Sequence, residues 1–79
     1  MPEIYVRRMP VDDALYKLDH YLNETYVAGT RIFRIVHGKG GGTLRNAVQD
    51  YLRHHPLVKS FRTGSYGEGE HGVTIVELV

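Results

Sequence analysis

Apolar residues follow two different spacings along this chain, and each spacing predicts one kind of element. Two stretches carry apolar residues every three or four positions, which predicts helices. The first begins after Pro10 and ends at Gly29. The second begins at Thr43, predicted as its N-cap, and stops before Pro56. Runs rich in β-branched and aromatic residues predict strands at residues 4–6, 31–36, 58–61 and 73–79.

The order of these elements, β-α-β-α-β-β, predicts the fold class. A strand, a long helix and a second strand form a βαβ unit, whose two strands are parallel. The run 73–79 has apolar residues on both faces, which favours a central strand that is covered at least partly on each side. We therefore predict an α/β two-layer sandwich, with a four-stranded mixed sheet and both helices on one face. A length of 79 residues predicts a single domain, 1–79.

The composition of the chain excludes several classes of function. The chain has no cysteine, which excludes a disulfide framework, a cysteine zinc site and a thiol nucleophile. No apolar run is long enough to cross a membrane. The histidines do not show metal-ligand spacing, so neither a metal nor a cofactor is expected. The absence of cysteine suits a reducing compartment, and we expect a cytoplasmic protein that does not bind membranes.

The net charge of +1 conceals an uneven distribution of charge. Residues 29–62 carry seven basic side chains and one acidic side chain, which gives this segment a net charge of +6. The segments before and after it carry −2 and −3. A basic face would attract phosphate, although scattered solvated charges would explain the same composition.

A glycine-rich connection joins the strand 31–36 to the second helix and carries the sharpest candidate chemistry. It has the sequence His-Gly-Lys-Gly-Gly-Gly-Thr over residues 37–43. The amides of Gly41, Gly42 and Thr43 should lie free at the helix N-terminus, where anions bind. Lys39 can meet a phosphate as a point charge. The run fits neither the Walker A pattern nor GxGxxG. A flexible connection with a solvated Lys39 is the alternative.

Four further glycines lie between residues 64 and 72, and this second loop is predicted to be exposed. If the two glycine loops meet over the strand ends, His71 would approach His37. Tyr66 would either stack on a base or pack on its own loop.

The glycine motif resembles the central motif of a known family. His37-Gly38-Lys39-Gly40, followed by Gly42-x-Leu44-Arg45, is similar to the motif of the Smr (small MutS-related) domain. The resemblance runs from about Val11 to Val79, and within the family it is strongest to the C-terminal domain of bacterial MutS2 proteins. It includes the strand 73–76 that follows Gly72.

The resemblance implies both a fold and a set of partners. The implied fold is like that of the C-terminal domain of translation initiation factor three. The implied functions are DNA binding and, in many members, nicking endonuclease activity, with restraint of recombination and ribosome rescue associated with MutS2. Expected partners are therefore DNA (branched or single-stranded), ribosomal RNA and the remainder of a MutS2-like ATPase.

The chain departs from the family at the end of its first strand. Family members have Asp-Leu-His-Gly or Asp-Leu-Arg-Gly where this chain has Tyr5-Val6-Arg7-Arg8. Arg7 matches the arginine variant, but Tyr5 replaces the acid and Arg8 replaces the glycine. A phenol cannot act as a carboxylate base at neutral pH. The added positive charge favours binding over cleavage.

We predict that the domain recognises nucleic-acid phosphate, with nicking as the leading activity and non-catalytic binding as the alternative. A protein-interaction domain is a third, plainer hypothesis. In a nuclease, His37 would activate water or protonate the leaving oxygen, and Arg7 and Lys39 would neutralise phosphate charge. Glu68 or Glu70 would then orient His37. In a binding module the same surface would hold the backbone without chemistry. The remaining candidate phosphate-binding residues are Arg8, Gly38, Gly40, Gly41, Gly42, Thr43, Arg45, Arg53, Lys59 and His71.

Overall fold

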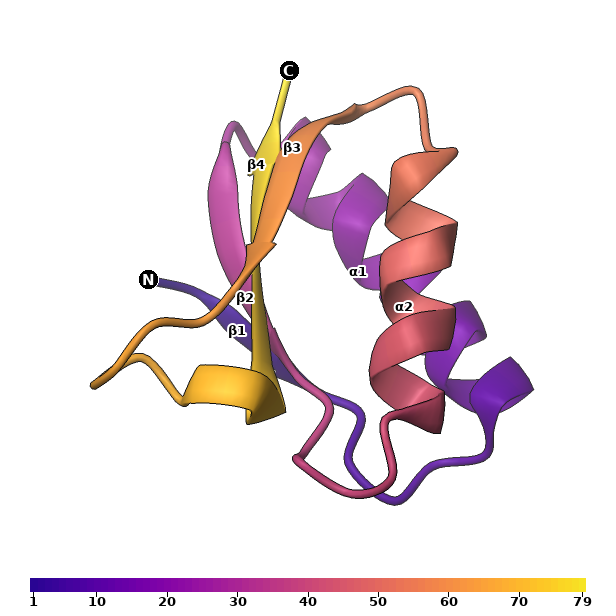
Figure 1. Cartoon of the computed structure of the whole chain (residues 1–79). Coiled ribbons are helices and arrows are strands. Elements are labelled where there is room, and N and C mark those ends of the chain that lie inside the picture. Colours follow the sequence, from indigo (N-terminus) through magenta and orange to yellow (C-terminus); the bar gives the residue numbers. More distant parts are fainter.

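Four strands form one mixed sheet, and two helices cover one of its faces (Figure 1). The computed structural model describes all of residues 1–79. This confirms the predicted two-layer α/β sandwich. The elements in chain order are β1 (Glu3–Tyr5), α1 (Val11–Val27), β2 (Ile32–Val36), α2 (Thr43–Arg53), β3 (Val58–Thr63), the 3-10 turn η1 (Glu70–Gly72) and β4 (Val73–Leu78).

The strand order is β1-β2-β4-β3, which places β4 inside the sheet as predicted. β1 runs parallel to β2, whereas β4 is antiparallel to both β2 and β3. Tyr5 is paired with Val36, and Val36 is paired with Val73. The chain therefore leaves β1, leaves β2 and enters β4 at the same edge of the sheet. Three loops meet there, and this edge carries the candidate site.

The core lies between the sheet and the helices. Alternate residues of the sheet face the helices, so Phe33, Ile35 and Val76 are fully buried. Leu18 and Leu22 of α1 stand four residues apart on one face, as do Val48 and Leu52 of α2, and all four are at most 1% exposed. Packing of these side chains holds the two layers together, since the chain has no disulfide.

The opposite face of the sheet has no helix, yet Ile75 at its centre is only 4% exposed. The register places Arg34 of β2 and Arg62 of β3 directly beside Ile75. Long arginine stems cover apolar surface while their charged ends reach carboxylates. Arg34 pairs with Glu3, and Arg62 pairs with Glu68. This explains how β4 can be apolar on both faces.

The main departures from the predicted elements lie around the second glycine loop. β3 continues to Thr63, which pairs with Thr74, so the strand is two residues longer than predicted. The predicted loop 63–72 is shorter, because residues 70–72 form η1. β3 is an edge strand with exposed polar positions, and its apolar signal is therefore weak.

Candidate functional site

The connection between β2 and α2 owes its path to two glycines in left-handed backbone conformations. Gly38 has φ +87°, and a Cβ there would meet the Nε of Arg7 at 3.1 Å. Gly42 has φ +88° and is the N-cap of α2. The prediction of Thr43 as the N-cap is therefore wrong. The cap position requires a left-handed backbone, which threonine adopts poorly, and α2 has no side-chain cap.

The backbone amides of this connection lack acceptors over an unusually long run. None of the N–H groups of residues 39–45 donates a hydrogen bond within the protein. The first intrahelical bond at this end runs from the Asn46 amide to the Gly42 carbonyl at 2.8 Å. An ordinary helix leaves about four amides unpaired at its N-terminus. Seven consecutive free donors and the positive end of the helix dipole form a surface suited to an anion.

Residues 39–45, which carry these amides, line a hollow with a volume of about 330 Å³. The structure brings ten of the thirteen predicted site residues to this hollow, together with Leu44, and no acidic residue lines it. We call it the glycine-loop pocket. Its lining residues are Arg7, Arg8, His37, Gly38, Lys39, Gly40, Gly41, Gly42, Thr43, Leu44 and Arg45.

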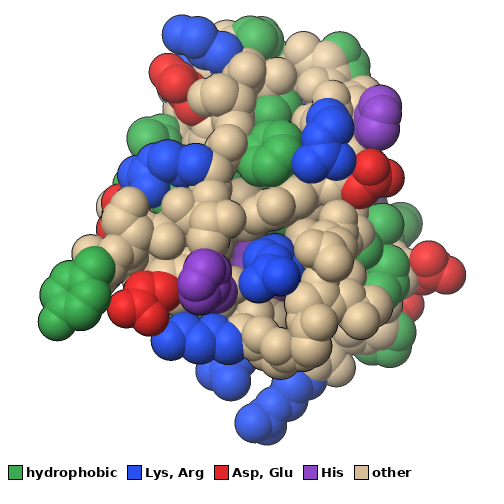
Figure 2. Space-filling view, in the orientation of Figure 1, with side chains coloured by type: hydrophobic (Ala, Val, Ile, Leu, Met, Phe, Trp, Pro, Cys, Tyr) green, Lys and Arg blue, Asp and Glu red, His purple; other side chains and the backbone are tan.

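The glycine-loop pocket gathers the basic side chains that have no partner. Of the ten lysines and arginines, seven make a hydrogen bond or an ion pair within the protein. The other three are Arg7, Arg8 and Arg45, and all three line the pocket. Figure 2 shows Lys and Arg side chains gathered at the lower end of the molecule, where the loop after β2 lies in Figure 1.

Gly40 and Gly41 differ from the glycines on either side of them. A Cβ at either position would meet nothing within 4 Å, and neither has a positive φ. Neither the backbone nor the packing of the protein therefore requires glycine there. A ligand that approaches the amides closely would require it, because a side chain would stand in its way.

His37 lines the pocket and is only 4% exposed. Its Nδ1 is 3.0 Å from the carbonyl oxygen of Gly38, and a carbonyl only accepts, so Nδ1 carries the proton. Its Nε2 then accepts from the hydroxyl of Thr74 at 2.8 Å. The Thr74 oxygen in turn accepts from the side-chain amide of Gln49 at 3.0 Å. Both ring nitrogens of His37 are thus engaged.

The environment of His37 favours the neutral ring. Burial lowers its pKa, the hydrogen bond to Gly38 acts in the opposite direction, and the positive charge of Arg45 lowers it further. The net direction is downward. In its resting state His37 is a neutral residue that supports the loop.

This shift predicts a loss of stability on mild acidification. Unfolded histidine titrates near pH ~6.5 and takes up a proton more readily than buried His37. The free energy of unfolding is therefore at its full value above pH ~6.5, and it declines as the pH falls below that value because the unfolded chain takes up the proton. Urea unfolding at pH 7.5 and pH 5.5 should show this decline in the original protein and a smaller one in His37→Gln. An equal decline in both would contradict the prediction.

The two glycine loops meet, which the sequence had left open. The Gly72 carbonyl accepts hydrogen bonds from the amides of His37 and Gly38, each at 3.0 Å. The Lys39 ammonium group lies 3.1 Å from the Glu70 carboxylate. These contacts fix the segment before β4 against the glycine-loop pocket.

The expectation that Glu68 or Glu70 orients His37 is wrong. Glu68 binds Arg62 through two hydrogen bonds of 2.7 and 3.0 Å, and Glu70 pairs with Lys39. The hydrogen-bond partners of His37 are Gly38 and Thr74 instead. Sequence reasoning missed Thr74 and Gln49. The signal for Thr74 was a polar residue on the strand face that it shares with Val76.

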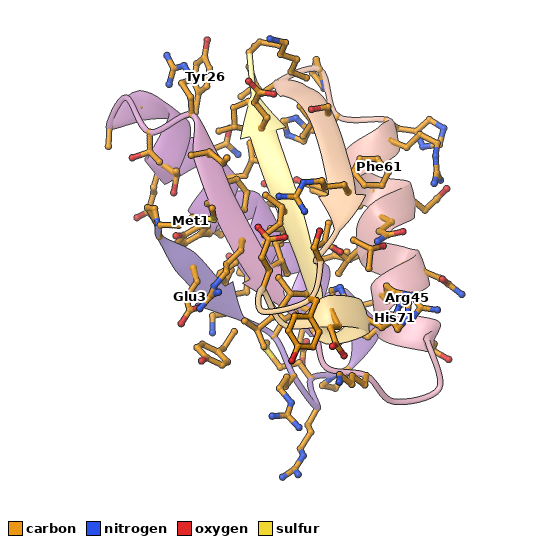
Figure 3. The ribbon with its side chains drawn as sticks, turned by 60° about the vertical axis from the view of Figure 1, so that its left-hand side comes forward. Met1, Glu3, Tyr26, Arg45, Phe61 and His71 are labelled. Carbon is orange, nitrogen blue, oxygen red and sulfur yellow. The ribbon has the colours of Figure 1, made fainter.

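Three predicted site residues do not line the pocket. Arg53 lies at the far end of α2, pairs with Asp50 and stands over the Phe61 ring, and Lys59 pairs with Glu77. His71 is exposed on η1. Figure 3 shows His71 and Arg45 at the loop end of the molecule and Phe61 away from both, and Gly72, the residue after His71, bonds to the amides of His37 and Gly38. His71 is therefore a neighbour of the pocket, whereas Arg53 and Lys59 are remote from it.

Arg8 occupies a backbone position that suits glycine. Its φ is +64°, which an L side chain adopts at a cost of about 1 kcal/mol. We predict that Arg8→Gly raises the free energy of unfolding by about 0.5–1 kcal/mol, measured by urea denaturation. The same variant loses a pocket cation and should bind an anionic ligand less tightly. Lower stability of Arg8→Gly would show that the arginine side chain supports the fold.

The structure offers neither a cluster of metal ligands nor a helix that could cross a membrane. No group of three or more histidine, aspartate and glutamate side chains is placed to hold a metal ion. Neither helix has the length and apolar character needed to cross a membrane.

Comparison with known proteins places the fold and the pocket motif in one family. The family model of the Smr domain matches residues 4–79. Endonuclease MutS2 of Caldicellulosiruptor saccharolyticus is 57% identical over 95% of this chain and 10% of its own length. The Clostridium tetani Endonuclease MutS2 is 51% identical over 96% of this chain and 10% of its own length. The chain thus spans about one tenth of the curated relatives that it matches.

Two solved structures have the same fold. The Smr domain of Thermus thermophilus MutS2 superimposes with a TM-score of 0.97 at 40% identity, covering 100% of this chain and 99% of that one. YdaL, a stand-alone small MutS-related protein of Escherichia coli, has a TM-score of 0.90 at 23% identity, covering 96% and 63% of the two chains. The likeness to YdaL concerns the fold alone. From the family model, the identities and the structural match, the chain belongs to the Smr domain family.

Proposed function

We propose that this domain binds the sugar-phosphate backbone of a nucleic acid in the glycine-loop pocket. The observation that carries the proposal is that the three basic side chains without a partner all line one hollow, beside seven amides without an acceptor. Amides at a helix N-terminus and arginine guanidinium groups both suit phosphate as hydrogen-bond donors. No carboxylate lines the pocket, and the neighbouring Glu70 carboxylate is paired with Lys39, so repulsion of a phosphate is small.

The contacts offered by the pocket are to the backbone rather than to base edges. Backbone amides and arginines positioned this way hold phosphates of any sequence. Affinity for an oligonucleotide should therefore fall steeply as salt rises and depend little on sequence. Titration of the isotope-labelled domain with a single-stranded oligonucleotide should shift the amide resonances of residues 39–45 most strongly. Shifts confined to another surface, or no binding at low salt, would overturn the proposal.

The exposed amides can be tested directly with Gly41→Ala. The added methyl group meets nothing in the free protein, so thermal unfolding should be unchanged or slightly raised. It would stand where a phosphate must approach the backbone, so affinity for the oligonucleotide should fall several-fold. Unchanged affinity would show that the backbone of Gly41 is not part of the binding surface.

A second candidate function is DNA nicking, favoured by the similarity to proteins named Endonuclease MutS2. In this scheme Arg7 and Lys39 neutralise charge on the phosphate, and His37 exchanges a proton with water or the leaving oxygen. His37 would first have to release its hydrogen bond to Thr74. Conversion of supercoiled plasmid to the nicked form should then be lost in His37→Gln and Lys39→Gln. Absence of nicking by the original protein, with or without divalent metals, would remove this candidate and leave binding intact.

The larger biological setting follows from the share of the relatives that the chain covers. We propose that the domain works as one part of a longer MutS2-like protein, because the chain covers only 10% of such a relative. An ATPase in that protein is a prediction from the resemblance. Binding of branched DNA, restraint of recombination and binding of ribosomal RNA stay predictions from the resemblance.

A further inference from the structure

Tyr66 stands out from the molecule at the tip of the loop between β3 and η1. It is 94% exposed, more than any other large hydrophobic side chain of the chain. The loop projects from the body of the protein, and a hydrophobic side chain lies at its end (Figures 1 and 2). The alternative that Tyr66 packs on its own loop is therefore wrong. Both faces of an aromatic ring this exposed are open to stacking on a flat partner.

The loop that carries Tyr66 is held by hydrogen bonds within the protein. The guanidinium group of Arg62 donates to both carboxylate oxygens of Glu68, at 2.7 and 3.0 Å. The Glu68 carboxylate also accepts from the Ser65 amide at 2.9 Å, and the Ser65 carbonyl accepts from the Glu68 amide at 2.9 Å. Arg62 holds the pKa of Glu68 at about 2, so the Glu68 carboxylate stays ionised and keeps these hydrogen bonds at neutral pH. A loop ordered in advance loses little entropy when it binds.

A second hollow leads from the glycine-loop pocket toward this loop. Its volume is about 360 Å³, and it shares four lining residues with the glycine-loop pocket: Arg7, Gly38, Lys39 and Gly40. Its other wall is formed by Val36, Gly69, Gly72 and Val73. Tyr66 lies three residues before Gly69, within about 11 Å along the chain. The Gly72 hydrogen bonds and the pair Lys39–Glu70 fix the distance between the two loops.

We propose that Tyr66 stacks on an unpaired base of the strand whose phosphate occupies the glycine-loop pocket, so that the domain prefers single-stranded to duplex nucleic acid. The inference rests on the proposed function and adds a class of substrate to it. Every base has an aromatic face, so stacking tolerates any sequence. Base faces in a duplex are covered by the neighbouring pairs. Only an unpaired or flipped-out base offers a face to a protruding ring.

The test compares four forms of the protein on single-stranded and duplex oligonucleotides of one sequence. Tyr66→Ala should weaken binding of the single strand about fivefold or more, whereas Tyr66→Phe should keep the affinity of the original protein. Tyr16→Ala, which removes a ring that is 70% exposed on α1, is the matched control and should have no effect. The original protein should bind the duplex less tightly than the single strand. Tyr66→Ala should bind the duplex as tightly as the original protein does. Affinities measured separately for single-stranded DNA and single-stranded RNA show which of the two Tyr66 stacks on.

An oligonucleotide with abasic sites separates stacking from contact with the backbone. The original protein should bind it less tightly than the intact strand, and Tyr66→Ala should cause no further loss. Equal affinities of Tyr66→Ala and the original protein for the intact strand would overturn the inference and leave the proposed function standing. The inference would also be overturned if Tyr66→Ala lowered the affinity for the abasic strand as much as the affinity for the intact strand. Failure of the original protein to bind any oligonucleotide would overturn both.

Discussion

Replacing Arg7, Arg8 and Arg45 together should weaken binding of a single-stranded oligonucleotide by about tenfold or more and should flatten its dependence on salt. Each phosphate contact to a single strand contributes about 0.7 to the slope of log affinity against log salt. Loss of three contacts should therefore lower the slope by about 2. Fluorescence anisotropy between low and physiological salt measures both quantities. We choose Arg7→Gln, Arg8→Gly and Arg45→Gln to remove the charge with little disturbance of the backbone.

The stability of this triple variant separates binding residues from supporting residues. None of the three arginines makes a hydrogen bond or an ion pair within the protein, so no polar partner is left unpaired when they are replaced. Their mutual repulsion is relieved as well, and the free energy of unfolding should stay the same or rise. A less stable variant would mean that the arginines stabilise the loop and are not kept free for binding a ligand.

Arg53 and Lys59 provide the matched control. Both are basic, and both were candidates on the basis of sequence, but each pairs with a carboxylate away from the pocket. Arg53→Gln with Lys59→Gln should leave the salt slope nearly unchanged. If this double variant lowers the slope as much as the triple variant, the binding face is broader than the glycine-loop pocket.

The fold was predictable because the pattern that indicates each element lies within the residues of that element. The apolar spacing of α1 and α2 and the β-branched runs of β2 and β4 are independent of distant residues. The cap of α2 was mispredicted, because a favourable cap residue such as Thr43 gives no sign that the backbone before it is left-handed. That sign lies in Gly42, one of three consecutive glycines that the sequence alone does not distinguish.

The charge of the site was only partly predictable. Summing charge along the chain assigned the basic face to residues 29–62, yet Arg7 and Arg8 lie in the segment with a net charge of −2. They join Arg45 because β1 is parallel to β2 and ends at the same edge. Conversely, Lys59 and Arg62 belong to the basic segment but are neutralised by Glu77 and Glu68. Whether a basic residue is free depends on which carboxylates the fold brings beside it, and composition does not record this.

The role of His37 shows the same limit at a single residue. Its position after a strand and before glycines suggested a catalytic base, but its chemistry is set by Thr74, 37 residues later, and by Gln49. In this arrangement Gln49 donates to Thr74, Thr74 donates to His37, and His37 donates to Gly38. The chain links α2, β4 and the start of the glycine loop. It makes His37 a positioning residue in the resting protein.

Removal of the central hydroxyl should therefore be costly. Thr74→Val keeps the shape of the side chain but leaves the Nε2 of His37 without a donor and weakens the hydrogen bonding of the Gln49 amide. Thr74 is fully buried, so water cannot replace the hydroxyl, and we expect a loss of about 1–3 kcal/mol in the free energy of unfolding. For a chain of this size each 1 kcal/mol corresponds to about 4–8 °C in Tm. Thermal and urea unfolding measure the change.

Thr63→Val is the matched control, because Thr63 also faces Gln49 but at 3.4 Å and in a partly buried position. We expect it to cost less than about 0.5 kcal/mol. Well below its melting temperature, Thr74→Val should bind the oligonucleotide nearly as well as the original protein, since the arginines and free amides are untouched. The triple arginine variant should show the opposite pattern, with affinity lost and stability kept. If Thr74→Val instead abolished binding without loss of stability, the buried hydrogen bonds would act on the ligand itself rather than on the loop that receives it.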